Sequence, residues 1–278
     1  MSPALPQIIT PTLLTKIGRT PNLPGHTWYF IAATTLSVLN RPDEIPKVYA
    51  QAIGSHNHPS AAASSSSSSA AAAAAAPERP HRDTSHATVD EQLRVSRRMR
   101  EALIKAAAIG GLPKAINSLL ALKAVTPPHL VDEPMGFSPT SRVVDIYDVP
   151  SSQILHRGQT FFDKVYGKVS KRVMGQMDRS GTEDLGLTAR LMYGYILSNT
   201  NVLTPAETSF VLIAGLIPQD VNPQLKGHLK GALNGGATVE EVRAVRDIVI
   251  DICKASGMKR LGDGEAGGWG WRSEVANL

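Results

Sequence analysis

The chain has 278 residues and a net charge of +5, with 42% hydrophobic, 5% aromatic and 19% charged residues. No apolar run approaches the ~18–20 residues that a membrane-spanning helix needs, so no membrane span is expected. The single cysteine, Cys253, excludes an intrachain disulfide. Basic residues are scattered among acidic ones rather than gathered in one stripe, which argues against nucleic-acid binding. The densest basic run, Arg94 to Arg100, is expected to be the solvated face of a helix.

The first part of the chain reads as helices on both sides of a low-complexity tract. An apolar run over 27–39 predicts one helix, which Arg41-Pro42 closes. Residues 60–76 are Ser and Ala alone, so 55–86 is predicted to be a disordered linker. Further helices are predicted from Thr88 to Gly110 and from about Pro113 to Ala124.

The second part resumes a helical pattern at about Gln159, after an irregular, Pro-rich connector at 126–156. Its last predicted helix has Val242, Val245, Val249 and Ile252 on one face and ends at Gly257. Helix starts are marked by the capping-box pattern Thr-x-x-Glu at Thr88–Glu91, Thr204–Glu207 and Thr238–Glu241.

Several segments recur along the chain. Residues 87–91 are nearly repeated at 237–241, and 31–32 and 52–53 match 213–214 and 232–233. The offset is larger upstream of the Ser/Ala tract, by about the length of that tract with its flanks. We interpret this as an internal duplication with a linker inserted into the first copy. The alternative is chance similarity between Ala-rich helix pairs.

The second half resembles carboxymuconolactone decarboxylase-like proteins, which share the alkylhydroperoxidase D-like (AhpD-like) fold. The matching segments are 193–198, 203–207 and 223–242, with His228 followed by Ala232-Leu233 and a glycine turn as the most specific part. The first half resembles the same unit over 39–46, 100–104 and 109–117.

This resemblance implies an all-α, AhpD-like helical bundle of two tandem units. The first, degenerate unit would span 1–125 and the second 157–258, followed by a flexible tail at 259–278. Assembly into homo-oligomers is also implied.

The thiol chemistry of the family is not expected here. Peroxidase members carry Cys-x-x-Cys-x-x-x-His with an upstream Glu, because one thiolate attacks and the other resolves the intermediate. If His228 is the motif histidine, the cysteine positions fall on Val221 and Gln224 and the Glu position on or near Ser209. Cys253 belongs to another helix and is expected to be a small core residue.

The decarboxylase branch needs no thiol and implies a carboxy-lyase acting on a small lactone or keto acid. His228 is then the candidate proton donor, Arg157 could hold a small acidic substrate, and Tyr166 and Tyr193 could donate hydrogen bonds. The alternatives are purely structural roles: a structural or surface position for His228, a helix start at Arg157, and core packing for Tyr166 and Tyr193. The first unit has Val48 at the position of His228, which leaves that copy structural.

No cofactor is expected, and the other histidines lack metal-ligand spacing. The alternative to a lyase is a non-catalytic, oligomeric binding protein with the same fold.

The C-terminal residues Ala276, Asn277 and Leu278 resemble a peroxisomal targeting tripeptide, with Asn277 in place of a basic residue. Fungal members of the family include peroxisomal ones, so we expect the peroxisome and an import receptor that binds an exposed C-terminus. Docking of the tail through its two Trp would weaken this case. A cytosolic location is the alternative, and mitochondrial import is disfavoured by the prolines near the N-terminus.

Overall fold

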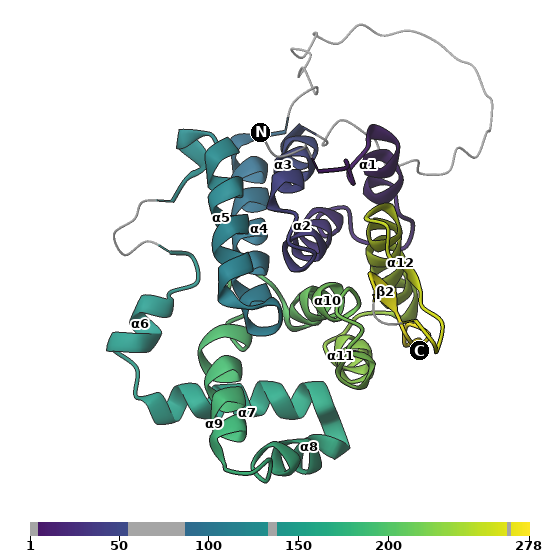
Figure 1. The fold of residues 1–278 in the computed structure, drawn as a ribbon. Helices are drawn as coiled ribbons and strands as arrows, with labels where there is room; N and C mark the ends of the chain where they lie inside the picture. The colour runs from purple at the N-terminus through teal and green to yellow at the C-terminus, as the bar shows by residue number, and fades with distance from the viewer. Residues whose placement is uncertain (1–4, 55–86, 133–137, 266–267) are drawn as a thin grey trace, which may run out of the picture.

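The computed structural model describes residues 5–54, 87–132, 138–265 and 268–278. These ranges are mostly helical, which confirms the all-α prediction (Figure 1). Their strands are the two-residue β1 (Lys259–Arg260) and β2 (Gly270–Trp271), which pair in parallel. The predicted linker at 55–86 lies outside the described residues. A search of the described helices finds none with the length and apolar character to cross a bilayer.

The α-helices follow one another with short connections. Their bounds are α1 (Pro11–Gly18), α2 (Trp28–Val38), α3 (Ile45–Gly54), α4 (Val89–Gly110), α5 (Leu112–Val125), α6 (Arg142–Tyr147), α7 (Ser151–Tyr166), α8 (Ser170–Met177), α9 (Asp184–Leu191), α10 (Pro205–Leu216), α11 (Asn222–Asn234) and α12 (Val239–Ala255). Single turns of 3₁₀-helix are η1 (Pro42–Glu44), η2 (Pro128–Leu130) and η3 (Gly167–Val169), and η4 (Met192–Leu197) is a π-helix.

The three predicted capping boxes are confirmed. At the start of α4, α10 and α12 the Thr hydroxyl accepts a hydrogen bond from the Glu backbone N–H, and the Glu carboxylate accepts one from the Thr backbone N–H. Each box therefore satisfies two donors that the helix itself leaves free. Gly257, with φ of 90°, follows α12 as predicted.

The predicted irregular connector at 126–156 is wrong in two places. Residues 142–147 form α6, and α7 begins at Ser151 rather than near Gln159. Pro150 directly precedes α7, a position at which proline ends the preceding segment without removing a helical hydrogen bond. His156-Arg157-Gly158 is consequently in the middle of α7 and not at its start.

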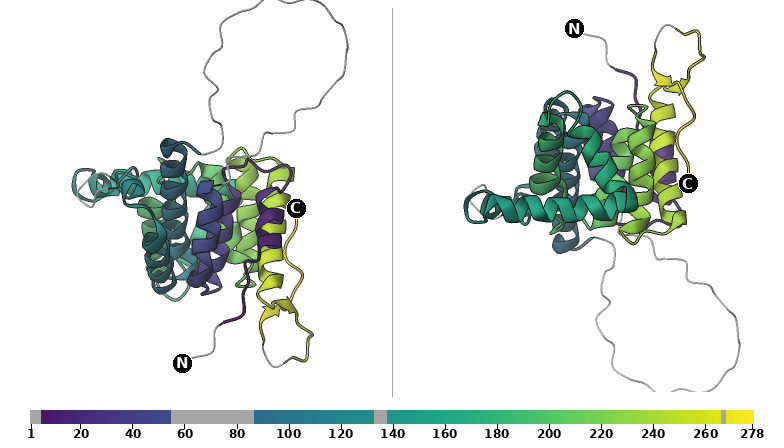
Figure 2. Two further views of the ribbon diagram at one scale, coloured as in Figure 1. Left: turned by 90° about the horizontal axis from the view of Figure 1, so that it is seen from above. Right: turned by 90° about the horizontal axis from the view of Figure 1, so that it is seen from below.

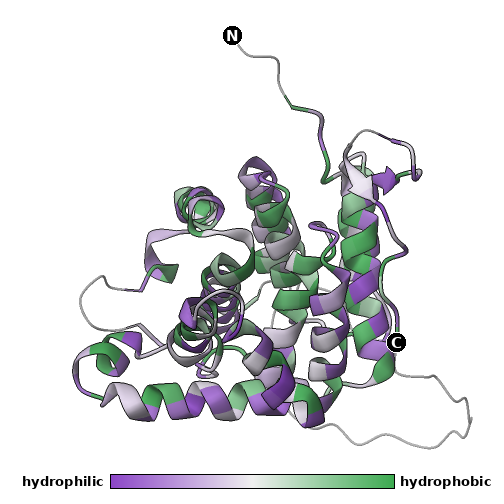
Figure 3. Ribbon diagram, turned by 60° about the horizontal axis from the view of Figure 1, so that its bottom comes forward, coloured by the Kyte–Doolittle hydropathy of each residue, from purple (hydrophilic) through white to green (hydrophobic). Residues whose placement is uncertain are grey.

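The core is built around α2 and α10. Every residue of α2 is buried, as are residues 207–216 of α10. Both helices contact α4 on one side and α12 on the other, and these four elements lie side by side in Figures 1 and 2. The buried apolar residues form one cluster that joins the two halves of the chain. Outer helices carry hydrophilic residues beside hydrophobic ones, as Figure 3 shows.

A second layer, below the core in Figure 1, brings α7, η4 and α11 together. Glycines allow their backbones to approach closely: an ideal Cβ on Gly158 of α7 would lie 2.5 Å from the backbone N of Gly194 in η4. A Cβ on Gly231 of α11 would lie 2.7 Å from Val165 Cγ1 of α7. This packing positions the predicted site residues.

The C-terminal segment packs against the body, which differs from the predicted flexible tail. Trp271 is buried, and its indole N–H donates to the carbonyl of Ile217 (2.9 Å). The Arg246 guanidinium donates to the carbonyls of Val275 and Ala276 (2.9 and 3.0 Å). The glycine-rich sequence did not reveal these anchors because each depends on a partner from a distant helix. Docking of this kind weakens the case for targeting through an exposed tail.

Candidate functional site

Three of the four predicted site residues lie together. His228 is on α11, Tyr166 at the end of α7 and Tyr193 in η4. His228 Nε2 lies 3.5 Å from the Tyr166 hydroxyl, and their rings meet edge to face with centroids 5.7 Å apart. Phe162 packs between Tyr166 and Tyr193, with its ring centroid 4.4 Å from that of Tyr166 and 4.8 Å, edge to face, from that of Tyr193.

The local sequence explains this arrangement. Gly227 precedes His228, and a Cβ there would lie 2.8 Å from Tyr166 Cε1. The missing side chain lets α11 approach the Tyr166 ring so that His228 can reach the hydroxyl.

The electrostatics of this cluster favour uncharged side chains. Burial lowers the pKa of His228 to about 4. Burial also raises the pKa of Tyr166 and, more strongly, that of Tyr193. His228 is 4% exposed, and its Nδ1 has no hydrogen-bond partner among the described residues. At neutral pH the cluster therefore consists of a neutral imidazole and two neutral phenols.

Arg157, the fourth predicted residue, is not part of this cluster. Its two terminal nitrogens donate to the Asp145 carboxylate (3.0 and 2.7 Å), and Nε donates to the Ser198 hydroxyl (3.1 Å). It also donates to the carbonyl of Gly194 (3.0 Å). The guanidinium thus ties α6 and η4 to α7 and has its donors engaged within the protein.

The thiol of Cys253 has the environment of a core residue, as predicted. It is fully buried in α12, and burial raises its pKa. A high pKa keeps the thiol protonated and unreactive at neutral pH. Val48, which the predicted duplication pairs with His228, is a buried apolar residue of α3. Within the described ranges no group of His, Cys, Asp or Glu has the geometry of a metal site.

The prediction that Arg94 to Arg100 form a solvated face is wrong for Arg98. Arg98 is 8% exposed, donates to the Glu207 carboxylate and lies over the Phe30 ring at 5.2 Å. Arg97 and Arg100 are partly buried and both donate to Asp132. The buried pair arises because α4 lies between the core helices and α5, so two of its faces are covered.

A buried charge network on α4 was not predicted. Lys105 is fully buried, and its ammonium group donates to the carbonyls of Leu197 (2.8 Å) and Asn199 (2.7 Å). Glu101, 3.6 Å away, accepts two hydrogen bonds from Arg142 of α6 (2.7 and 2.6 Å). Burial lowers the pKa of Lys105 to about 7. Helical spacing could have indicated the burial of Arg98 and Lys105, because both share a helix face with the buried residues 95, 99, 102 and 106.

Comparisons with known proteins give two relatives with the same name. Peroxisomal protein 2 of Schizosaccharomyces pombe is 42% identical over 166 residues, which cover 60% of this chain and 73% of that protein. Peroxisomal protein 2 of Saccharomyces cerevisiae is 33% identical over 274 residues, which cover 90% of this chain and 92% of that protein. No family model and no solved structure matches the chain.

Proposed function

The chain belongs to the peroxisomal protein 2 family, and from this premise we propose that it is a peroxisomal binding protein that carries out no chemistry at His228. Its location in the peroxisome follows from both relatives. We also propose that it keeps the AhpD-like bundle as two tandem units. In support, the order α2–α3–α4 recurs as α10–α11–α12, and α4 and α12 both contact α2 and α10.

The observation that carries this proposal is the environment of His228. A general acid must hold a proton at the working pH and must reach its substrate. His228 is buried, and a pKa of about 4 leaves its imidazole in the neutral form at neutral pH, which is a much weaker acid than the imidazolium. Arg157 does not supply a substrate-binding cation next to His228, because its guanidinium donates to Asp145, Ser198 and Gly194. Dithiol peroxidase activity is not expected either, because the chain has one cysteine.

One observation favours a second candidate, the carboxy-lyase. His228 Nδ1 is a buried polar atom without a partner among the described residues. Such atoms are uncommon in folded proteins and often mark a position where a ligand or water binds. In this alternative a small lactone or keto acid would meet His228 as proton donor, with Tyr166 and Tyr193 as hydrogen-bond donors.

A decarboxylation assay separates the two candidates. Purified protein is incubated with a panel of lactone and keto acids, and release of carbon dioxide is measured. The binding proposal predicts no release above the uncatalysed rate. The lyase alternative predicts turnover that His228→Asn and Tyr166→Phe abolish, while the exposed control His156→Asn on α7 leaves it unchanged. Turnover of that kind would refute the binding proposal.

Two further partners are part of the proposal. A second copy of the chain is proposed because α6 and α9 expose large apolar side chains, among them Ile146, Tyr147, Leu185, Leu187 and Leu191. An import receptor is proposed to bind Ala276, Asn277 and Leu278. Ala276 is buried against the body, so the segment would have to detach first. Fusion of residues 268–278 to a fluorescent protein should give peroxisomal fluorescence, and diffuse fluorescence would remove this partner.

A further inference from the structure

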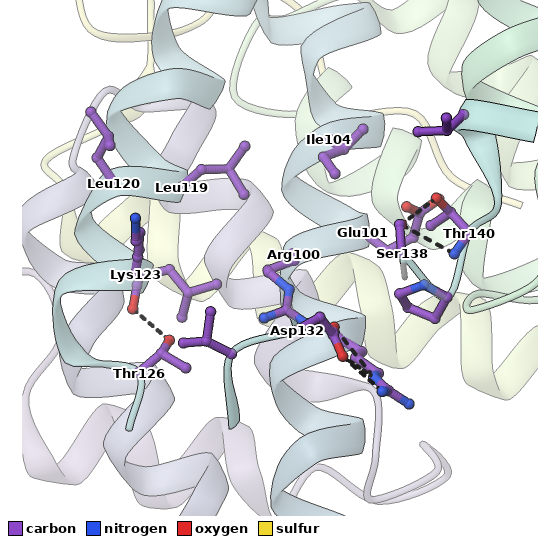
Figure 4. Close-up of a pocket in the computed structure, with 15 residues that line it drawn as sticks. Arg100, Glu101, Ile104, Leu119, Leu120, Lys123, Thr126, Asp132, Ser138 and Thr140 are labelled. Atoms are coloured by element: carbon purple, nitrogen blue, oxygen red, sulfur yellow. Dashed lines mark hydrogen bonds and ion pairs between the residues drawn. The ribbon is translucent and has the colours of Figure 1, made fainter. Parts of the chain in front are cut away.

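A cavity of about 440 Å³ opens between α4, α5 and residues 138–143, away from the His228 cluster (Figure 4). This volume lies in the range of ~300–1,000 Å³ that is typical of small-molecule sites. In Figure 4, Leu119, Leu120 and Lys123 stand on one side, Ser138 and Thr140 on the other, and Arg100 and Asp132 between them. The cavity is therefore formed by side chains from α4, α5 and the segments 126–132 and 138–143.

The walls of the cavity are largely apolar. Ile104 from α4, Leu119 and Leu122 from α5, and Val131 and Val143 from the following segments line it. Apolar walls of this kind favour a ligand with an aliphatic or aromatic part, because burial of that part removes apolar surface from water.

The charged groups that line the cavity leave a positive excess. Arg97 and Arg100 from α4 share one carboxylate, that of Asp132, so one of the two guanidinium charges is not compensated locally. Arg97 Nη1 and Arg100 Nε donate to no acceptor within the described ranges. Lys123 from α5 also lines the cavity and forms no ion pair with a described residue.

The remaining acidic group does not offset this excess. Glu101 lines the cavity, but both of its oxygens accept hydrogen bonds from Arg142, and Lys105 lies 3.6 Å away. The Ser138 and Thr140 hydroxyls hydrogen-bond to each other (2.7 Å) and add no charge.

An adjoining cavity of about 380 Å³ extends the basic side. It shares Arg97 and Pro139 with the first cavity and is also lined by Arg94, Arg98 and the acidic Asp90. Arg98 is compensated by Glu207, whereas Arg94 forms no ion pair with a described residue. Arg97 therefore lines both cavities, with Arg100 and Lys123 in the larger one and Arg94 and Arg98 in the smaller one.

We propose that the larger cavity binds an organic carboxylate with an aliphatic body. The carboxylate accepts hydrogen bonds from Arg97 and Arg100, and the aliphatic part lies between Ile104 and Leu119. This inference rests on the proposed binding function and names its ligand class. Guanidinium groups suit the task because they bind a carboxylate through paired N–H donors.

Isothermal titration calorimetry with dodecanoate below its micelle concentration tests the proposal. We expect saturable, one-to-one binding to the full chain. Dodecanol and dodecyltrimethylammonium have the same alkyl chain without the negative charge. Their affinity should be lower by about tenfold or more, as expected for loss of a charge-assisted hydrogen bond.

Variants locate the site. Arg97→Gln should weaken dodecanoate binding about tenfold. Leu119→Trp should also weaken it, because the larger side chain occupies the apolar part of the cavity. Lys171→Gln, an exposed control on α8, should bind as the unaltered chain does. Circular dichroism confirms that each variant is folded.

Absence of saturable binding, equal affinity for dodecanoate and dodecanol, or normal binding by both cavity variants would each overturn this proposal. None of these outcomes bears on His228, whose role is decided by the decarboxylation assay.

Discussion

Arg98 is buried in the core, where its charge is paired with that of the Glu207 carboxylate. Burial raises the pKa of Glu207, but hydrogen bonds from His26 and Arg98 outweigh this and lower it to about 2. Arg98→Met would leave this carboxylate buried without its main partner. We expect the variant to lose about 3–5 kcal/mol of unfolding free energy, the usual cost of breaking a buried pair.

Urea denaturation at pH 7 measures this loss. Arg94→Met is the control, because Arg94 is one turn earlier on α4, exposed and without an ion pair to a described residue. It should change stability by less than about 0.5 kcal/mol. Equal midpoints for the two variants would show that the Arg98–Glu207 pair does not stabilise the fold.

Lys105 should make stability depend on pH. Its pKa is lowered by burial from 10.5 to about 7 in the folded protein. Between these values the unfolded chain binds more protons than the folded one, so stability rises with pH through this window. Below about pH 7 both states are protonated and the dependence ends.

The measurement is the unfolding free energy of the protein minus that of Lys105→Met, followed from pH 6 to pH 9. The difference should be flat below pH 7 and then grow by up to about 1.4 kcal/mol per pH unit. A difference that stays constant across the range would show that Lys105 keeps its ordinary pKa in the fold.

Part of the candidate site could be predicted from the sequence. His228 was a candidate because it matches the histidine of the family motif, and the structure places Tyr166 and Tyr193 near it. The close approach at Gly227 that brings Tyr166 to His228 was not predicted. The engagement of Arg157 with Asp145 was not foreseen. Such a pair depends on where α6 lies, and the sequence around Arg157 does not predict the position of α6.

Helix starts were the most predictable elements. A capping box is a contact between residues three apart, so Thr88, Thr204 and Thr238 carry their own structural information. α6 is different: Ser141 before it makes no side-chain cap, and its Arg142 and Asp145 are bound by Glu101 and Arg157 of other helices. An element held by such distant partners cannot be read from its own residues.

The contact between α7 and η4 depends on Gly158. A Cβ there would lie 2.5 and 2.6 Å from backbone atoms of Gly194, which cannot move aside as a side-chain end can. We expect Gly158→Ala to destabilise the protein by about 1–3 kcal/mol, the typical range for overpacking. Gly54→Ala in α3 is the control, because a Cβ there meets no atom within 4 Å.

Thermal denaturation compares the two alanine variants. The Gly158 variant should melt at a clearly lower temperature, while the Gly54 variant should be neutral or slightly more stable, since alanine favours helix. A neutral Gly158→Ala would mean that α7 and η4 do not pack as closely as the structure has them.

The C-terminal segment is held to the body of the protein by Arg246. We expect Arg246→Ala to release residues 275 and 276, because two backbone carbonyls lose their donor. Hydrogen exchange of the Ala276 amide, which donates to Asn222 Oδ1 (2.7 Å), should become faster. Arg243→Ala, exposed on the same helix, should leave the exchange unchanged. Equal exchange in both variants would show that other contacts hold the segment.

The central claim is that the protein binds an organic carboxylate between α4 and α5 and not beside His228. A crystal structure of the protein grown with dodecanoate tests it most directly, because it shows where a small acid is held. The account predicts the aliphatic chain between α4 and α5, with the carboxylate about 3 Å from the Arg97 and Arg100 nitrogens. It also predicts no ligand at His228 Nδ1. A carboxylate bound instead beside His228, Tyr166 and Tyr193, with the α4–α5 cavity unfilled, would contradict the account.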